Sequence, residues 1–372
     1  MKMNKKLLAI LLSTFMVLPL SSFEWGGVEK LGLGVNTSDF SEYSPNLSSS
    51  TYLWLSTPFG ESGLKFMAEG VFKCSFDLAS LSLSNNMIAD VDLFKLDYAK
   101  DALSLSFGRF YNNDITYNVL SQNLDGAKLT YTSSIFEIGA YCGYTGLLNG
   151  LNTYMLSLYG SELSYDANYY ALAYPYVILG ANFKLPYLPL NQALALETLA
   201  CFDVKTQNSN RYYLNTKLYG PLGSKCFYDL SCVLGAINFK DFMASVGTTL
   251  NYYINDAFAL NFALSYSSSN YAGITSTPLF NNVAGLDARS SAGFKTGATY
   301  QLNSLLLAAN VSALCSIPET GFSYAGTQLD LSLIYNIFYD FQLSYGAYAY
   351  IDAKDSSSNN KYGMNLNLSL AF

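Results

Sequence analysis

Residues that could carry out chemistry are few in this sequence, and histidine is absent. A Ser–His nucleophile, a histidine general base and a histidine metal site all need an imidazole ring. The chain does contain serine, lysine and carboxylate side chains, but no group of them has the spacing that a Ser–Lys or carboxylate mechanism requires. We therefore predict that the chain is not an enzyme, and we predict no cofactor and no metal site.

One pair of carboxylates has a spacing that could bind a cation. Asp90 and Asp92 are two residues apart in a strand-like segment, which would place both carboxylates on one face. Two carboxylates alone do not specify a metal ion, and a solvated rim beside an external loop is the favoured interpretation. The six cysteines have no zinc-like spacing, so they are small apolar strand residues or, for one pair, a disulfide: Cys74, Cys142, Cys201, Cys226, Cys232 and Cys315.

The C-terminal segment 362–372 alternates between two kinds of residue. Its even-numbered positions carry Tyr, Met, Leu, Leu, Leu and Phe, and its odd-numbered positions carry Gly, Asn, Asn, Ser and Ala. This period of two predicts a strand with one apolar and one polar face. Segments 258–266 and 341–346 repeat the pattern. In a barrel that spans a membrane, the apolar face contacts lipid and the polar face lines water.

The composition suits a membrane protein that crosses without helices. Apolar residues make up 51% of the chain and charged residues 13%, yet after Leu20 no run approaches the length of about 18 apolar residues that a membrane helix needs. A closed β-barrel is the other structure that pairs every backbone group in lipid. Residues 1–22 have a basic start, an apolar run from Leu7 to Leu20 and two serines, so we predict a cleavable signal peptide followed by a barrel over 23–372.

The alternation predicts an all-β fold, a transmembrane antiparallel β-barrel of about 18 strands, with 16 as the open alternative. The alternation of apolar and polar residues is interrupted after Leu93, which makes the fourth predicted strand, 89–99, uncertain. The strands are expected at 26–35, 50–57, 63–74, 89–99, 102–110, 125–132, 134–145, 174–184, 192–203, 209–220, 223–233, 241–253, 256–266, 289–301, 304–315, 326–337, 340–351 and 362–372.

The connections between these strands alternate between short and long. Long ones are expected at 36–49, 75–88, 111–124, 146–173 and 267–288, medium ones at 204–208, 234–240, 316–325 and 352–361, and tight turns lie between them. Outer-membrane barrels have this asymmetry, with short periplasmic turns and long extracellular loops. The pattern therefore predicts that both termini lie at the periplasmic end and that the protein is located in the cell outer membrane.

Charged side chains in the strands fall mainly opposite the apolar face, where they would line a lumen. Their mixed sign predicts a hydrated wall with weak ion selectivity, and more acidic loops would favour cations at the mouth. Without its predicted signal, which contains Lys2, Lys5 and Lys6, the chain has 17 basic and 27 acidic residues, a net charge of −10 that argues against nucleic acid as a partner. The predicted pore-lining residues are Lys65, Glu69, Lys73, Lys128, Glu137, Glu197, Arg211, Lys217, Asp229, Lys295 and Asp330.

The segment Leu103–Tyr144 resembles Gram-negative outer-membrane porins. A strand that ends in Gly-Arg leads into a loop, and the next strand opens with Asp-Gly before a Tyr and a short Ser turn; the matching residues are Gly108, Arg109, Asp125, Gly126, Tyr131, Thr132, Ser133 and Ser134. The resemblance implies that loop 111–124 folds into the lumen and forms a constriction with its single acidic residue, Asp114. The family's loops tend to be longer and more acidic, so a solvated external position for Asp114 stays open.

The pattern and the resemblance together predict a passive, water-filled channel for ions and small hydrophilic solutes. Its expected partners are outer-membrane lipid, those solutes and the barrel-assembly machinery, which would recognise the terminal Phe372. A homotrimer and a monomer both stay open. The alternative function is a surface-exposed barrel that acts as an adhesin or variable surface antigen through its long loops, because loop 146–173 is rich in tyrosine: Tyr154, Tyr159, Tyr165, Tyr169 and Tyr170.

Overall fold

The computed structural model describes residues 23–38, 42–83, 87–153, 169–205, 209–275, 290–317, 321–353 and 360–372. The predicted signal peptide over residues 1–22 lies outside these ranges. Within them, no helix is long and apolar enough to cross a membrane. All structural statements below refer to the described residues.

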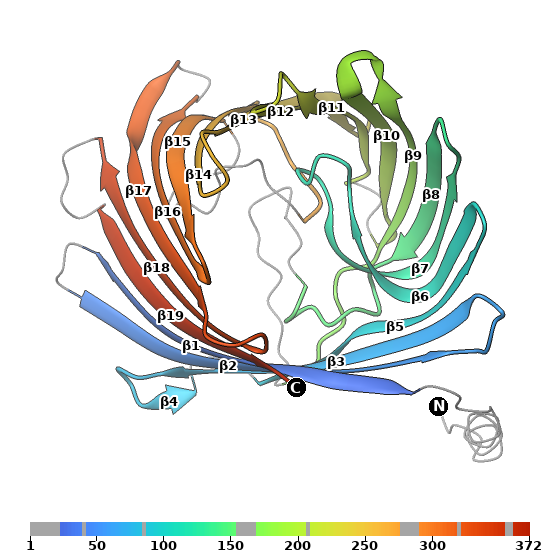
Figure 1. Ribbon diagram of the computed structural model, residues 1–372, viewed down its shortest axis with the longest axis horizontal. Helices are drawn as coiled ribbons and strands as arrows, with labels where there is room; N and C mark the ends of the chain where they lie inside the picture. Colours follow the sequence, from blue (N-terminus) through green and yellow to red (C-terminus); the bar gives the residue numbers. More distant parts are fainter. Residues whose placement is uncertain are drawn as a thin grey trace.

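The strands form one antiparallel sheet that closes on itself where β1 pairs with β19 (Figure 1). The two-residue strand β4 pairs only with the end of β3, and β3 pairs directly with β5, so the eighteen other strands make the barrel wall. The bounds are β1 Glu24–Ser38, β2 Glu42–Pro58, β3 Leu64–Asp77, β4 Ser82–Leu83, β5 Ile88–Lys100, β6 Leu103–Asn113, β7 Ser121–Thr132, β8 Glu137–Tyr144, β9 Tyr176–Leu188, β10 Gln192–Asp203, β11 Arg211–Pro221, β12 Cys226–Ile237, β13 Asp241–Tyr253, β14 Phe258–Ser267, β15 Ser291–Leu302, β16 Leu305–Ser316, β17 Ser323–Asn336, β18 Phe341–Asp352 and β19 Lys361–Ala371, with a short 3-10 helix η1 at Pro189–Asn191.

The predicted fold class is confirmed, with eighteen wall strands rather than sixteen, and each predicted strand overlaps an observed one. The predicted long connection 36–49 is wrong, because β1 continues to Ser38 and β2 begins at Glu42. The segment Pro45–Ser48 contains Pro, Asn and Ser, which are typical of turns. Here those residues continue the ladder, and Val35 pairs with Pro45.

A β-bulge explains why the apolar parity slips in β5. Glu69 pairs with Leu93 but Gly70 pairs with Val91, so Asp92 is an extra residue with no partner in the ladder. A bulge of this kind shifts the alternation of faces by one residue. The strand is therefore not regular at Asp92, but Asp90 pairs with the inward Val71, and the side chains of Asp90 and Asp92 both reach Asn152, as described below.

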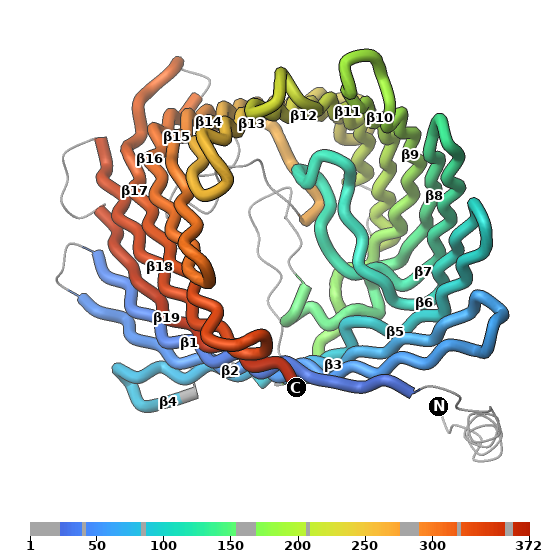
Figure 2. The backbone as a smooth tube through the Cα atoms, viewed as in Figure 1, coloured from blue at the N-terminus to red at the C-terminus, as the bar shows by residue number. Residues whose placement is uncertain are grey.

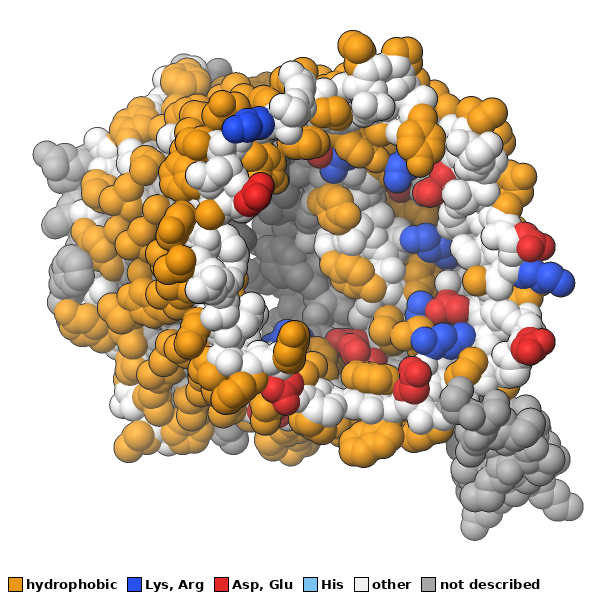
Figure 3. All heavy atoms as spheres, viewed as in Figure 1, with side chains coloured by type: hydrophobic (Ala, Val, Ile, Leu, Met, Phe, Trp, Pro, Cys, Tyr) orange, Lys and Arg blue, Asp and Glu red, His pale blue; other side chains and the backbone are white. Residues whose placement is uncertain are grey.

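The two faces of the wall follow the predicted alternation. Leu31 pairs with Leu368 and Leu33 with Leu366, and these apolar side chains point away from the ring, while the intervening asparagines of β19 point into it. Figure 3 shows apolar side chains over the outer surface and charged side chains gathered inside the ring. The wall is thus apolar outside and polar inside, as membrane barrels with an aqueous lumen are.

A cluster of buried apolar residues lies inside the ring, against part of the wall. It joins inward side chains of the wall strands to two segments that leave the wall and enter the lumen. Its members are Phe110, Val119, Leu120, Leu124, Tyr141, Tyr176, Ile178, Leu199, Cys201, Tyr213, Val233, Met243, Tyr271, Ala272 and Ile274. The cluster fixes these two segments in place because their apolar side chains are removed from water on that side.

Candidate functional site

Two segments fold into the barrel and narrow it (Figure 2). The first inward segment, residues 114–120, connects β6 to β7, and the second inward segment, residues 268–275, follows β14. The two segments are hydrogen-bonded to each other. The amides of Ile274 and Thr275 donate to the carbonyl of Val119 at 2.7 and 3.0 Å, and the Tyr271 hydroxyl donates to the carbonyl of Asn118 at 2.5 Å. They form one constriction unit across the lumen.

Asp114 determines the shape of the first inward segment. Its carboxylate accepts hydrogen bonds from the backbone amides of Thr116, Val119 and Leu120 at 2.9, 2.9 and 2.8 Å. The side chain is only 1% exposed. A carboxylate that accepts several amides satisfies donors that a tight turn would otherwise leave without partners. Asp114 therefore holds the turn of the segment, and it does not present its charge to the lumen.

Glu197 fastens the first inward segment to the wall from β10. One carboxylate oxygen accepts the amide of Ile115 at 3.0 Å, and the other accepts the hydroxyl of Tyr141 at 3.0 Å. The side-chain amide of Asn215 donates to Glu197 at 3.1 Å and to Asp114 at 3.3 Å, so it joins the two carboxylates. Side chains from three strands of the wall, β8, β10 and β11, thus hold a single turn of chain.

Arg211 fastens the second inward segment to the wall from β11. Its guanidinium donates to the carbonyl of Gly273 and, at 3.3 Å, to the hydroxyl of Tyr176. The neighbouring Tyr213 hydroxyl donates to the carbonyl of Ala272 at 2.6 Å. Burial raises the pKa of Tyr271 in this segment well above its ordinary value, so that hydroxyl stays protonated and keeps its hydrogen bond to the first segment.

The twelve residues predicted for the pore and its constriction separate into two groups. Asp114, Glu197 and Arg211 are buried, with exposures of 1%, 1% and 0%, so they hold the inward segments and do not line water as predicted. The inward parity of a strand residue does not reveal whether a loop covers it. The others lie at inward positions of the wall, and their part in permeation stays a prediction: Lys65, Glu69, Lys73, Lys128, Glu137, Lys217, Asp229, Lys295 and Asp330.

A cavity of about 310 Å³ lies between the first inward segment and the wall. Lys217 forms an ion pair with Asp229 at 2.8 Å, and its ammonium lies 5.3 Å from the centre of the Tyr117 ring. Charges of both signs therefore meet at the narrow part of the lumen. The lining residues are Asn113, Asp114, Ile115, Tyr117, Glu137, Asn182, Phe183, Lys184, Ala195, Lys217, Tyr219 and Asp229.

The sequence analysis predicts an inward fold for 111–124 but misses the second inward segment, which it assigns to an external connection over 267–288. The apolar run Tyr271–Ile274 within that connection was the available signal, because an exposed loop gains nothing from such a run. In the structure Tyr271 and Ile274 are buried. Residues 276–289 of the predicted connection lie outside the described residues.

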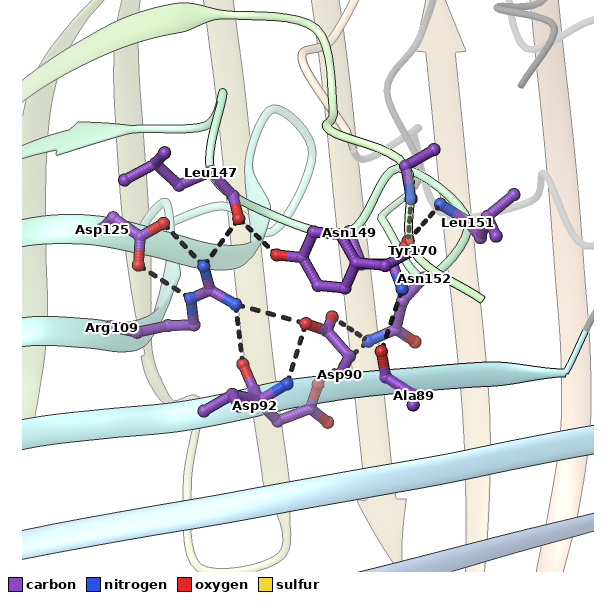
Figure 4. A network of polar contacts seen from close by, with 12 residues as sticks. Ala89, Asp90, Asp92, Arg109, Asp125, Leu147, Asn149, Leu151, Asn152 and Tyr170 are labelled. Atoms are coloured by element: carbon purple, nitrogen blue, oxygen red, sulfur yellow. Dashed lines mark hydrogen bonds and ion pairs between the residues drawn. The ribbon is translucent and has the colours of Figure 1, made fainter. Parts of the chain in front are cut away.

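A split in the wall between β5 and β6 is closed by a polar network (Figure 4). The two strands pair only as far as Phe94 and Arg109, and beyond this point β6 continues along β7 alone. The Arg109 guanidinium binds the Asp125 carboxylate through two hydrogen bonds of 2.7 and 2.9 Å. It also donates to Asp90 at 3.2 Å and to the carbonyl of Leu147 at 2.9 Å. Arg109 thus joins β5, β6, β7 and the segment after β8 at the split.

Asn152 completes the closure from the segment after β8. Its side-chain amide donates to Asp90 at 2.8 Å and to Asp92 at 2.9 Å, and its oxygen accepts the Lys73 ammonium at 2.5 Å. The two aspartates that could bind a cation therefore have Arg109 and Asn152 as donors. Among the described residues, no group of three or more Cys, Asp and Glu side chains is arranged to hold a metal ion. All six cysteines, each of them in a described range, are free.

A closed barrel of eighteen antiparallel strands, apolar outside and polar inside with segments folded into the lumen, is the fold of outer-membrane channel proteins. The chain is similar in structure to Pseudomonas aeruginosa OccK1 (OpdK), with a TM-score of 0.69 and 11% identity over 95% of this chain and 99% of that one. It is similar to P. aeruginosa OccK5 (OpdH), at 0.67 and 10% over 95% and 98%, and to Acinetobacter baumannii OccAB4, at 0.66 and 11% over 96% and 99%.

No protein-family model and no curated protein matches the sequence. The barrel fold that the resemblance of Leu103–Tyr144 to Gram-negative porins implies is the fold that the chain shares with these structures. At this level of identity, what this chain shares with these structures is the architecture of the barrel. The side chains that form the constriction are described from this chain alone.

Proposed function

We propose that this chain is a passive, water-filled channel of a bacterial outer membrane that admits ions and small hydrophilic solutes. The observation that carries the proposal is the closed eighteen-stranded wall, with apolar side chains outside and charged side chains around a central hollow (Figure 3). Barrels of 16 to 18 strands enclose a lumen wide enough for water. The constriction unit then limits the size of the solute.

Export through a signal peptide at residues 1–22 and recognition of Phe372 by the barrel-assembly machinery belong to the same proposal. Phe372 closes the barrel next to β1, since its amide and carbonyl exchange hydrogen bonds of 3.0 and 2.9 Å with Gly27. A terminal aromatic residue with this position is available at the periplasmic end during assembly. The proposal assigns no reaction to the chain.

The mixed charges at the constriction support weak selectivity for ions. Lys217 is paired with Asp229, and the nearby wall contributes Lys184 and Glu137 to the same cavity. Opposite charges at short distance cancel much of each other's field in the lumen. One of the similar structures is that of OpdK from P. aeruginosa with vanillate, an aromatic carboxylate. Vanillate is therefore a reasonable probe solute for this chain.

Conductance of the purified, refolded protein in a planar bilayer tests the proposed function. We expect discrete current steps, a reversal potential near zero in a salt gradient, and a reduced current when a solute of vanillate size enters the constriction. Absence of steps at every voltage would overturn the channel function. A large reversal potential would overturn only the weak selectivity.

No observation in the structure favours the alternative function as an adhesin or surface antigen. Tyr154, Tyr159 and Tyr165 lie outside the described residues. Tyr170 contributes to the closure of the split in the wall, since its hydroxyl donates to the carbonyl of Leu147. The described part of the tyrosine-rich loop therefore helps to close the wall of the barrel.

A further inference from the structure

The split between β5 and β6 opens toward the lipid-facing side of the wall. Phe94 and Phe107 lie where the pairing of the two strands stops, at outward positions with exposures of 55% and 71%. Phe107 and Arg109 follow Leu103, the first residue of β6 after a tight turn, by four and six residues. With a rise of about 3.4 Å per residue and a tilt of about 40°, they lie about 10 and 16 Å from that turn, within an apolar band about 25 Å tall. The split therefore begins where hydrocarbon chains surround the barrel.

Two backbone features turn the strands apart at this point. Gly108 has a φ of 118°, and a methyl group added there would lie 2.2 Å from the carbonyl oxygen of Phe94. Glycine adopts this conformation freely, which suits the residue before Arg109 to a strand that leaves its neighbour. On the facing strand, the bulge at Asp92 bends β5 in the same region. The sequence thus builds the split into the wall, and the polar network described above closes it.

A pocket of about 540 Å³ lies in the split on the outer side of the polar network, and we call it the outer pocket. Its volume falls within the range of about 300–1,000 Å³ that is typical of small-molecule sites. Its walls are apolar and largely aromatic, and its floor is the polar network (Figure 4). The apolar lining residues are Val91, Phe94, Phe107, Leu147 and Tyr170, and the polar network contributes Asp90, Arg109 and Asp125.

The Arg109 guanidinium at the floor of the outer pocket has no donor left for a ligand. Two of its N–H groups bind Asp125, one binds Asp90, and the remaining two bind the carbonyls of Val91 and Leu147 at 2.8 and 2.9 Å. These bonds use every N–H group of a guanidinium. The Asp125 carboxylate, in contrast, is 20% exposed and has about four acceptor sites, so it can accept a further hydrogen bond. The floor therefore suits a donor and does not suit an anion.

A second cavity, of about 370 Å³, lies behind the polar network on the lumen side. Asn152 lies between the two spaces, because it lines this cavity and donates to Asp90 at the floor of the outer pocket. Carboxylates outnumber cations around the split, so the balance of charge on both sides disfavours a negative group. The carboxylates are Glu69, Asp90, Asp92 and Asp125, and the cations are Lys73 and Arg109.

We propose that the outer pocket binds a single-chain amphiphile whose head donates a hydrogen bond and carries no negative charge. The molecule enters from the surrounding lipid, its head donates to Asp125, and its hydrocarbon chain packs against the aromatic walls. One guanidinium spans the floor between Asp90 and Asp125, so the slot admits one chain and not the several chains of a bilayer lipid. The inference rests on the membrane location within the proposed function, and it does not depend on conduction.

Photolabelling of the refolded protein in phosphatidylcholine vesicles tests the site, with hexadecanol that carries a diazirine in its chain as the probe. We expect labelling of the peptides that contain Val91 and Phe107 to saturate and to fall with excess unlabelled hexadecanol. Labelling elsewhere on the outer face, for example at Leu331 of β17, should rise in proportion to the probe. Labelling that saturates nowhere on the wall would overturn the proposal. Current steps from the same preparation report the channel function separately, so the two failures are distinguishable.

Matched variants and a second probe test the pocket and the class of its ligand. Val91 lines the outer pocket and Val311 lies on the outer face of β16, and both residues are 44% exposed. We expect Val91→Trp to fill the pocket and lower the saturable labelling at least about tenfold, and Val311→Trp to leave it unchanged. Hexadecyl sulfate with the same diazirine is permanently anionic and should label the wild-type pocket at least about tenfold less than the alcohol. Equal labelling of the two variants, or equal labelling by the two probes, would count against the proposal.

Discussion

The inner wall of the barrel has two halves that use polar residues differently. The half from β3 to β12 carries most of the inward charges, and the two inward segments pack against part of it (Figures 2 and 3). The half from β13 through β19 to β2 is lined mainly by Asn, Ser, Thr and Gly, with Lys30, Lys295 and Asp330 as charged members at the middle of its strands. The comparison indicates that much of the charge in the first half serves to hold protein segments.

The second half is smooth because asparagine side chains lie across glycines of the next strand. A methyl group added at Gly346 would lie 2.6 Å from the side-chain oxygen of Asn365, and one added at Gly32 would lie 2.8 Å from that of Asn367. The carboxamides are therefore flat against the wall, and they present hydrogen-bonding groups of no net charge to the lumen. Solutes and water would pass along this side, opposite the constriction unit.

Of the substitutions that test the difference between the two halves of the wall, the removal of Asp114 should have the largest effect on the channel. In Asp114→Ala, the amides of Thr116, Val119 and Leu120 lose their acceptor, and each buried amide without a partner costs about 1–3 kcal/mol. The first inward segment avoids this cost by leaving the wall. We expect a higher and noisier single-channel conductance in a planar bilayer.

The matched control for that variant is Asp330→Ala on the opposite half. Asp330 accepts a hydrogen bond from Gln328 at 2.6 Å and touches neither inward segment. Its removal should leave the size of the current steps unchanged. Equal effects of the two substitutions would show that the acidic charge, rather than the shape of the segment, limits the current.

Replacing Arg211 tests the second inward segment in the same way. Arg211→Met removes the buried donor to the carbonyl of Gly273 and to Tyr176, and hydrogen bonds from a charged group are worth about 1.5–3 kcal/mol each. We expect the midpoint of unfolding in denaturant to fall by an amount that corresponds to about 2–3 kcal/mol. Lys295→Met, at an inward position of β15, is the control and should change stability by less than about 0.5 kcal/mol.

The sequence predicts the wall better than it predicts the constriction, for a physical reason. The period of two fixes which side of each strand meets lipid, so Leu366, Leu368 and the charged inward residues were assigned to their faces without knowledge of the fold. Only locally ambiguous segments failed, such as Pro45–Ser48, whose turn-like residues continue β2.

The contacts of the constriction are distant in sequence and follow no period. Asp114 is joined to Asn215, and Tyr271 to Asn118, across more than one hundred residues. A period of two places Glu197 and Arg211 inside the barrel but gives no information about which loop covers them. The same applies to the split in the wall, where Asn152 reaches Asp90 and Asp92 from sixty residues away.

Arg109 is another charged residue of the first half that holds a segment of the protein. It lies at the rim, where it contacts the segment after β8. In Arg109→Gln, the paired hydrogen bonds to Asp125 and the contact with Asp90 are lost, at a cost of about 1–2 kcal/mol for this half-buried site. We expect the segment 145–153 to become accessible to protease added to intact cells. Lys65→Gln, at an inward position of β3 outside this network, should leave the cleavage pattern unchanged.

The smallest effect is expected in the smooth half, at the glycines beneath the asparagines. In Gly346→Ala the new methyl group displaces the carboxamide of Asn365, which can turn into the lumen because it is the end of a flexible side chain. We expect a loss of stability of no more than about 1 kcal/mol and a small reduction in conductance, because an amide now projects into the water. The double variant Gly346→Ala, Asn365→Ser restores the room and should recover the original conductance. If Gly346→Ala changed the current as much as Asp114→Ala, the two halves of the wall would contribute equally to the constriction, and the distinction between them would have to be abandoned.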